Sequence, residues 1–295
     1  MNSDGLNPVP EETIDTLVKD SIDMHIHAGP HLDPRPDALR VTLDAQEAGM
    51  RAIVLKSRSY PTAPVASIVG LTAHDIAVFG SLCLNFEVGG LNPHAVELSA
   101  KLGAKVVWMP TFSAANHFKT NEQSGEGISI LDGRGRILPV VREILEIIKA
   151  WDMVLATGHL NKPEIFALVA DARQMRLSKI VITHVMEPVT SLTIEEQKRL
   201  ASKGAIIEHI VVPCMPYFAL RRHKVGCPEP GEIAAAIKAV GADHVLMSTD
   251  MGHSDGPRPV EGMRTFVALM LGCGLSEEEV KLMVQTIPAR LLGLV

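Results

Sequence analysis

The sequence predicts a single (β/α)8 barrel over residues 1–295, and three observations predict it. Short β-rich segments alternate with helical segments along the whole chain. Several β-rich segments are almost wholly apolar, as expected for parallel strands that are covered on both faces. Many helical segments end on a glycine that is followed at once by the next β-rich segment, as in EAGMRAIVL, KLGAKVVWM and AVGADHVLM. The length of 295 residues suits one large barrel or two small domains, and no linker or low-complexity stretch divides the chain.

The elements follow one another in a regular order. The expected strands are residues 22–27, 52–56, 76–84, 105–109, 153–157, 179–183, 205–208 and 245–248. The expected helices are residues 39–48, 62–74, 93–102, 139–150, 163–175, 194–203 and 231–240. Several helices open with strong start signals, among them Asn92-Pro93 and Thr193 before two glutamates. Eight strands in alternation with helices are typical of a closed barrel.

Two connections are longer than the rest. Residues 110–138 follow the fourth strand and are rich in Gly, Asn and Ser, and residues 212–230 follow the seventh strand and contain four prolines. Each comes after a strand and before its helix, so each lies at the C-terminal face of the barrel, where active sites form. We expect these loops to act as lids.

Composition excludes several classes of protein. With 28 Lys and Arg against 34 Asp and Glu, the net charge is −6, which argues against a nucleic-acid binder and gives no support to a polybasic membrane contact. No apolar run is long enough to span a bilayer. The N-terminal residues lack the features of a signal peptide, and the four cysteines form no CxxC pair, so a cytoplasmic protein with reduced thiols is expected.

Histidines mark the strand ends. The first strand ends in DMHIH, and because side chains alternate along a strand, Asp23, His25 and His27 are expected to share one face. His159 follows the fifth strand, His184 the sixth and Asp250 the eighth. A barrel brings its strand ends to one ring, so these residues are expected to converge there. Four imidazoles and one carboxylate suit Zn²⁺ or another borderline divalent metal better than Ca²⁺ or Mg²⁺.

The ordered set Asp23-x-His25-x-His27, His159, His184 and Asp250, followed by the closing segment IPARLLGL, resembles the amidohydrolase superfamily of metal-dependent barrels. The resemblance covers essentially the whole chain. The chain is similar most of all to a short amidohydrolase-like family of uncharacterised function, in which HxHAGP, VLKS, GGLNP and ATGHL recur.

The resemblance implies roles for these residues. His25, His27, His159, His184 and Asp250 would bind one or two divalent ions, most favourably zinc, with manganese or iron as alternatives. Asp250 would also be the catalytic base that takes a proton from metal-activated water. Asp23 would hold a histidine ring in place or would be a structural buried acid.

The sequence departs from the two-metal pattern at one strand. Many two-metal members carry a bridging Lys or Glu at the end of the fourth strand, but here that strand ends in VWMPT. Lys56, at the end of the second strand, is the interesting substitute: it would bind an anionic substrate group, bridge metals as a carbamate, or form a structural ion pair. Glu87 is another candidate bridge.

Other polar groups near the barrel mouth carry weaker predictions. Arg35, Lys56 and Arg58 hint at a positive rim that would suit an anionic small-molecule substrate. His31, Arg58 and Glu208 are candidates for binding substrate or supporting the ligands, and periodicity does not decide whether Glu208 or His209 points inward. For each of these residues, and for His117, a solvated loop position or a core hydrogen bond is the alternative to a role in catalysis. For His253 a loop position is expected. A homo-oligomer is compatible with the sequence, which does not specify its state.

Three functions remain open on this basis. The leading hypothesis is a metal-dependent hydrolase of a small-molecule amide, cyclic amide, lactone or ester. The second is a one-metal decarboxylase or hydratase, since the bridging residue of the fourth strand is missing. The third is a non-catalytic metal-binding barrel.

Overall fold

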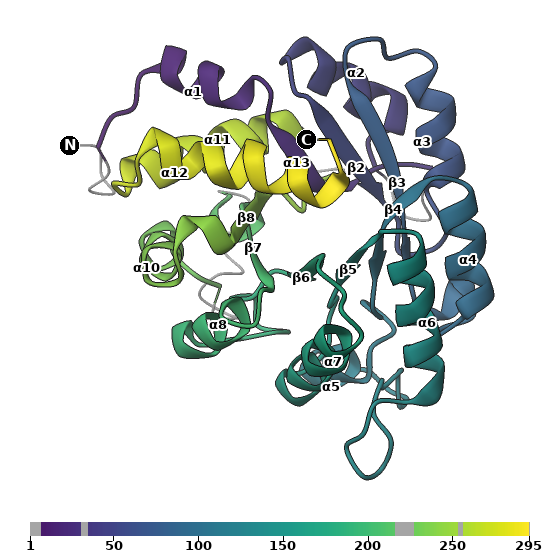
Figure 1. The fold of residues 1–295 in the computed structure, drawn as a ribbon. Helices are drawn as coiled ribbons and strands as arrows, with labels where there is room; N and C mark the ends of the chain where they lie inside the picture. Colours follow the sequence, from purple (N-terminus) through teal and green to yellow (C-terminus); the bar gives the residue numbers. More distant parts are fainter. Residues whose placement is uncertain (1–6, 31–34, 216–226, 253–255, 295) are drawn as a thin grey trace.

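The computed structural model describes residues 7–30, 35–215, 227–252 and 256–294. Eight parallel strands form one sheet in the order β1 to β8, with helices around the outside, so the predicted (β/α)8 barrel is confirmed (Figure 1). The strands are β1 Ile22–His27, β2 Ala52–Lys56, β3 Ala77–Cys83, β4 Ala104–Trp108, β5 Val154–Ala156, β6 Ile180–Ile182, β7 Ile206–Ile210 and β8 Val245–Ser248. Each overlaps the strand that the sequence predicts.

The helices alternate with the strands as expected. They are α1 Glu11–Val18, α2 Ala38–Glu47, α3 Ala63–Gly70, α4 Pro93–Lys101, α5 Ala115–Thr120, α6 Pro139–Ala150, α7 Lys162–Gln174, α8 Ile194–Ala201, α10 Pro230–Val240, α11 Pro259–Gly272, α12 Glu277–Lys281 and α13 Ile287–Leu292. Short helical turns lie at η1 Phe86–Val88, η2 Val212–Cys214, η4 Ala242–His244 and η5 Leu282–Thr286. The long connection after β4 contains α5, a helix that the sequence reading treats as loop. No helix in the described ranges is long and apolar enough to cross a membrane.

Two apolar clusters fill the structure. The larger one lies between the strands and the surrounding helices. The smaller one joins alternate residues of neighbouring strands, such as Val54, Val106 and Val154, to Ile287 and Leu291 of α13. The Arg51 guanidinium, just before β2, donates to the Leu294 carbonyl, so α13 closes the N-terminal end of the barrel. The opposite, C-terminal end is left for polar side chains.

The barrel closes between β8 and β1. The Asp250 amide donates to the His25 carbonyl at 2.9 Å, and the His27 amide donates to the Met251 carbonyl at 2.7 Å. Asp23 strengthens this seam because its carboxylate accepts the Thr249 amide at 3.1 Å and the Thr249 hydroxyl at 2.5 Å. The closure places the end of β8 beside the end of β1.

A bulge in β1 corrects one sequence expectation. Asp23 pairs with Ile53, but the next paired residue, Ile26, aligns with Leu55, so β1 holds one extra residue between them. The Asp23 carboxylate accepts the His25 amide at 3.1 Å, and an amide engaged in this way is diverted from the ladder. Simple alternation across Asp23, His25 and His27 is therefore wrong. His27 aligns with Lys56 of β2, whereas Asp23 binds backbone and Thr249 and not an imidazole.

Candidate metal centre

Three predicted ligands meet where β1 and β8 end. His25 Nε2 lies 2.9 Å from Asp250 Oδ1, and His27 Nε2 lies 3.0 Å from the same oxygen. One ligand atom from each of the three residues falls within 4.8 Å of the others. His25 and His27 are buried, and Asp250 keeps 19% of its side chain exposed. Two imidazole nitrogens and one carboxylate oxygen form a donor set that suits Zn²⁺ or a similar ion.

Glu208 fixes the orientation of His25. The Nδ1–H of His25 donates to Glu208 Oε1 at 3.1 Å, and the same carboxylate accepts the His184 amide at 3.1 Å. Because Nδ1 faces Glu208, Nε2 is the nitrogen that faces Asp250, as in carboxylate–histidine–metal arrangements. Burial opposes ionisation of Glu208, but the neighbouring His25 lowers its pKa below the usual value. Glu208, not His209, therefore points toward the site.

The protonation states of His25 and Asp250 depend on each other. Burial alone lowers the pKa of His25, yet the charges of Asp250 and Glu208 raise it to about 9 despite Lys56. Burial alone raises the pKa of Asp250, but His25 and His27 hold it well below its usual range. Protonated His25 thus donates from Nε2 to ionised Asp250. A cation that binds Nε2 must displace this proton, so metal binding is expected to release protons.

The backbone is unusual at two site residues. Asp250 has φ of +55° and His184 has φ of +30°, a region that residues other than glycine rarely adopt. Such conformations persist only where the surroundings impose them, and they concentrate at functional sites. The chain after β8 passes close to the end of β1. A Cβ at Gly252 would lie 1.7 Å from the His27 carbonyl oxygen. Only glycine permits this close approach.

Lys56 enters the same group from β2. Its Nζ lies 2.7 Å from His25 Nε2 and 5.0 Å from the centre of the Trp108 ring. Because Nε2 carries one hydrogen at most, it cannot both donate to Asp250 and accept from Lys56; the raised pKa of His25 favours donation to Asp250. Trp108 fills the end of β4, where two-metal barrels of the resembling family carry a bridge.

A second group of imidazoles lies across the mouth. The ring centres of His159 and His184 are 4.9 Å apart, and His159 Nδ1 lies 2.8 Å from His117 Nδ1. Burial is the main cause that lowers the pKa of His117 and His159, and it brings the pKa of His184 to about 4. Neutral imidazoles offer the lone pairs that metals need. Among the described residues, however, only His25, His27 and Asp250 have their ligand atoms gathered within 4.8 Å.

The α5 segment is docked onto this mouth. The side-chain amide of Asn116 donates to the carbonyls of His159 at 3.0 Å and Val189 at 2.6 Å, which holds α5 against the connections after β5 and β6. This contact places His117 beside His159. Gly158 permits the tight approach of β5 to β4, since it has φ of +58° and a Cβ there would lie 2.4 Å from the Met109 carbonyl oxygen. The docked helix supports a wall role for the connection after β4.

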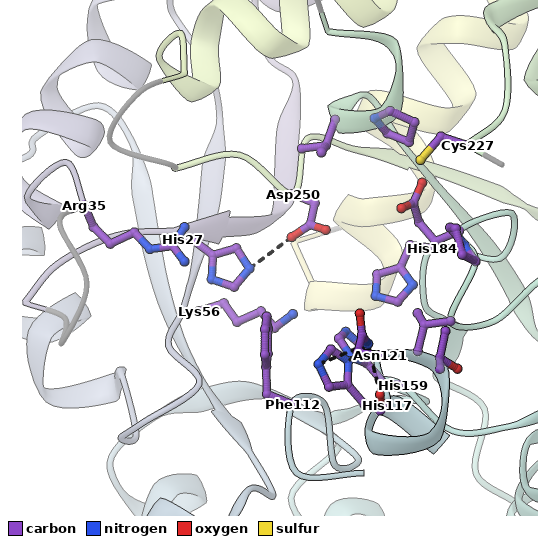
Figure 2. Close-up of a pocket in the computed structure, with 16 residues that line it drawn as sticks. His27, Arg35, Lys56, Phe112, His117, Asn121, His159, His184, Cys227 and Asp250 are labelled. Carbon is purple, nitrogen blue, oxygen red and sulfur yellow. Dashed lines mark hydrogen bonds and ion pairs between the residues drawn. The ribbon is translucent and has the colours of Figure 1, made fainter. Parts of the chain in front are cut away.

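These groups surround one pocket of about 840 Å³ (Figure 2). Its walls include His27, Arg35, Lys56, Phe112, His117, His159, His184, Glu187, Cys227 and Asp250. Arg58 lies over the Phe112 ring at 4.7 Å, so it flanks the pocket through that ring. His31 and His253, together with much of the connection after β7, fall outside the described residues.

Sequence reasoning missed two residues of the site. Glu187 lines the pocket from the connection after β6, and Thr190 lies with its hydroxyl 3.3 Å from His184 Nδ1. Both lie in MEPVT, a loop that directly follows the predicted ligand His184. The general rule that connections after barrel strands build the active face was the available signal.

Comparison with known proteins was made by sequence and by structure. The family described as Family of unknown function (DUF6282) matches residues 20–208, more than half of the chain. No curated protein matches the sequence.

Solved structures share the fold over nearly the whole chain. An amidohydrolase from Pseudomonas aeruginosa is 15% identical, with a TM-score of 0.65 over 96% of this chain and 98% of that one. The probable dipeptidase PvdM from the same organism is 12% identical, with a TM-score of 0.65 over 97% and 98%. A metallo peptidase from Rhodobacter sphaeroides, bound to a phosphinate mimic of the dipeptide L-Ala-D-Ala, is 15% identical, with a TM-score of 0.51 over 99% and 92%. At these identities the likeness shows the fold alone, which is the predicted (β/α)8 barrel.

Proposed function

The chain belongs to the family of unknown function DUF6282, and we propose that it is a metal-dependent hydrolase of a small-molecule amide, cyclic amide, lactone or ester. The observation that carries the proposal is the convergence of His25, His27 and Asp250 on one point of a pocket at the C-terminal end of the barrel. Structures with the same barrel include proteins described as an amidohydrolase and as metallo peptidases, which supports the same reaction class.

The donor set fits a divalent ion. His25 Nε2, His27 Nε2 and Asp250 Oδ1 would hold it, with zinc favoured by two nitrogens and one oxygen. Such an ion supplies a Lewis acid for the substrate carbonyl and makes hydroxide available near neutral pH. His159 and His184 are proposed as further ligands on the opposite wall, for a second ion or to complete the first.

The chain's own residues perform the proton transfers. Asp250 lines the pocket and is ionised, so it can accept a proton from the attacking water and return it to the leaving group. Glu208 keeps the His25 ring in its orientation throughout. Lys56 and Arg35 place positive charge on the same pocket, which favours a substrate with an anionic group. The docked α5 segment contributes His117 to the wall of the pocket.

A one-metal lyase is the second candidate, and one observation favours it. Trp108 occupies the end of β4, and only one three-residue ligand group is gathered among the described residues. Metal stoichiometry separates the two: two ions per chain favour hydrolysis. With one ion, incorporation of ¹⁸O from water into a newly formed carboxylate identifies hydrolysis. Release of CO2, or addition of labelled water across a double bond to give an alcohol, identifies a lyase.

The ligand assignment is tested by metal analysis of protein purified without chelator. We expect at least one transition metal per chain in the wild type and none in the His25→Ala/His27→Ala double variant. His94→Ala is the matched control, because His94 is exposed on α4 and is not among the residues that line the pocket. Full metal content in the double variant would refute the assignment. Metal without turnover on amides, hydantoins, lactones and esters would favour the non-catalytic reading.

A further inference from the structure

Glu187 is a carboxylate of the pocket that the proposed reaction does not use. It lies in the connection after β6 and lines the same pocket as His184 and Asp250. Its backbone is fixed, because its amide donates to the His184 carbonyl at 3.1 Å and its carbonyl accepts the amides of Thr190 at 2.8 Å and Ser191 at 2.7 Å. The backbone of Glu187 is therefore held at a defined place in the wall.

The charge of Glu187 is not balanced by the described chain. Its Oε1 is buried and has no hydrogen-bond partner in these ranges, and no Lys, Arg or His of the described residues forms an ion pair with it. Leaving a buried polar group unsatisfied costs free energy, so such a group calls for an explanation. A bound ligand that donates a hydrogen bond to Oε1 would satisfy this group.

His209 lines a small cavity together with Glu187. Its Nε2 is also buried and has no partner in the described ranges, and both residues line a small cavity of about 10 Å³ beside the pocket. That is close to the volume that one water needs. A water there would bridge Oε1 to His209 and leave the other carboxylate oxygen for the pocket. The carboxylate would then be preorganised by the wall behind it.

The pocket wall carries positive side chains as well as the Glu187 carboxylate. Arg35 and His184 lie on opposite sides of Asp250 (Figure 2). Glu187 follows His184 by three residues. Lys56 adds a second positive group near His25. Anionic ligand groups are favoured where these cations lie, and a cationic group is favoured near Glu187. Glu187 is not gathered with His25, His27 and Asp250 in the ligand group, which separates it from metal binding.

We propose that Glu187 determines substrate class by binding a protonated amino group, so that the enzyme acts on small amphoteric compounds whose anionic group is bound by Arg35 and Lys56. This inference rests on the proposed metal-dependent function and names its substrate. A dipeptide has the required pair of charges. An amino-acid amide or an amino-substituted lactone has it when a side chain or ring substituent adds a carboxylate. Glu187 is a specificity residue here, since it contacts the amino group and not the reacting carbonyl.

The test uses pairs of metal-binding probes that differ only by an amino group. Acetohydroxamate is compared with glycine hydroxamate, and propionohydroxamate with β-alanine hydroxamate, by titration calorimetry on the metal-loaded protein. For at least one pair, wild type should bind the amino probe about tenfold to a hundredfold more tightly, the range for a charge-assisted hydrogen bond. Glu187→Gln should lose this preference and keep its affinity for the plain hydroxamate. Glu187→Asp should keep part of it.

A control variant and the possible outcomes distinguish failure of this inference from failure of the proposed function. Glu195→Gln changes an exposed carboxylate of α8 and should behave as wild type. Equal binding of both probes by wild type, or an unchanged preference in Glu187→Gln, would overturn the inference while leaving the metal proposal intact. Loss of bound metal in Glu187→Gln would identify a ligand and would also overturn it. If no hydroxamate binds and no metal is found, the proposed function itself fails and takes this inference with it.

Discussion

Replacing Glu208 with Gln removes the charge that holds His25 while preserving the size of the side chain. Glu208 accepts two buried donors, the His25 Nδ1–H at 3.1 Å and the His184 amide at 3.1 Å. The amide of Gln keeps one acceptor oxygen and presents an NH2 group in place of the other. One of the two donors therefore loses its partner, or both share the remaining oxygen in poorer geometry.

The magnitude follows from that geometry. An unsatisfied buried donor costs about 1–3 kcal/mol, so the free energy of unfolding of the metal-free protein should fall by that amount. Loss of the group that orients a ligand typically weakens metal binding by about 10- to 100-fold, or about 1.4–2.7 kcal/mol. Removing the Glu208 charge also lowers the pKa of His25, which eases proton release and offsets a part of this loss.

Urea unfolding of the metal-free protein measures the first effect, and competition titration against a zinc indicator measures the second. Glu195→Gln serves as the control, because it makes the same chemical change on the exposed face of α8. If Glu208→Gln bound metal with wild-type affinity, His25 would not depend on Glu208, and the assignment of Nε2 as a ligand atom would lose its support.

Three further predictions concern the frame of the site. Gly158→Ala should lower the melting temperature well beyond Gly103→Ala. Both glycines have positive φ, but only at Gly158 would a Cβ lie 2.4 Å from the Met109 carbonyl oxygen at the end of β4. Equal losses in melting temperature would contradict the close approach. Burial lowers the pKa of His209 to about 4, so its stabilising contribution is full above pH 6.5 and falls by about 3 kcal/mol as pH drops through 4; urea unfolding of His209→Asn should show a shallower pH dependence, and an unchanged one would contradict burial of a neutral ring. Lys56→Met should retain metal in elemental analysis, and loss of metal would assign Lys56 a ligand or bridging role beside His25.

The fold could be read from the sequence because its determinants are local. Apolar strands, helix start signals and glycine stops depend on neighbours a few residues away, so all eight strands were located to within two residues at each end. The rule that strand ends converge in a barrel then brought His25, His27 and Asp250 together, although they are far apart in the chain.

Only the tertiary structure decided the rest of the site. The bulge in β1 arises because Asp23 accepts the His25 amide, and alternation by itself places Asp23 on the wrong face. Glu208 rather than His209 points inward because the register of β7 is set by its pairing with β6 and β8. His117, on α5, and Glu187, in the connection after β6, reach the pocket through segments whose course depends on docking contacts such as those of Asn116. The spacing of apolar residues along the sequence indicates which face of a strand or helix is buried. The register between strands and the docking of loops are set instead by contacts between elements.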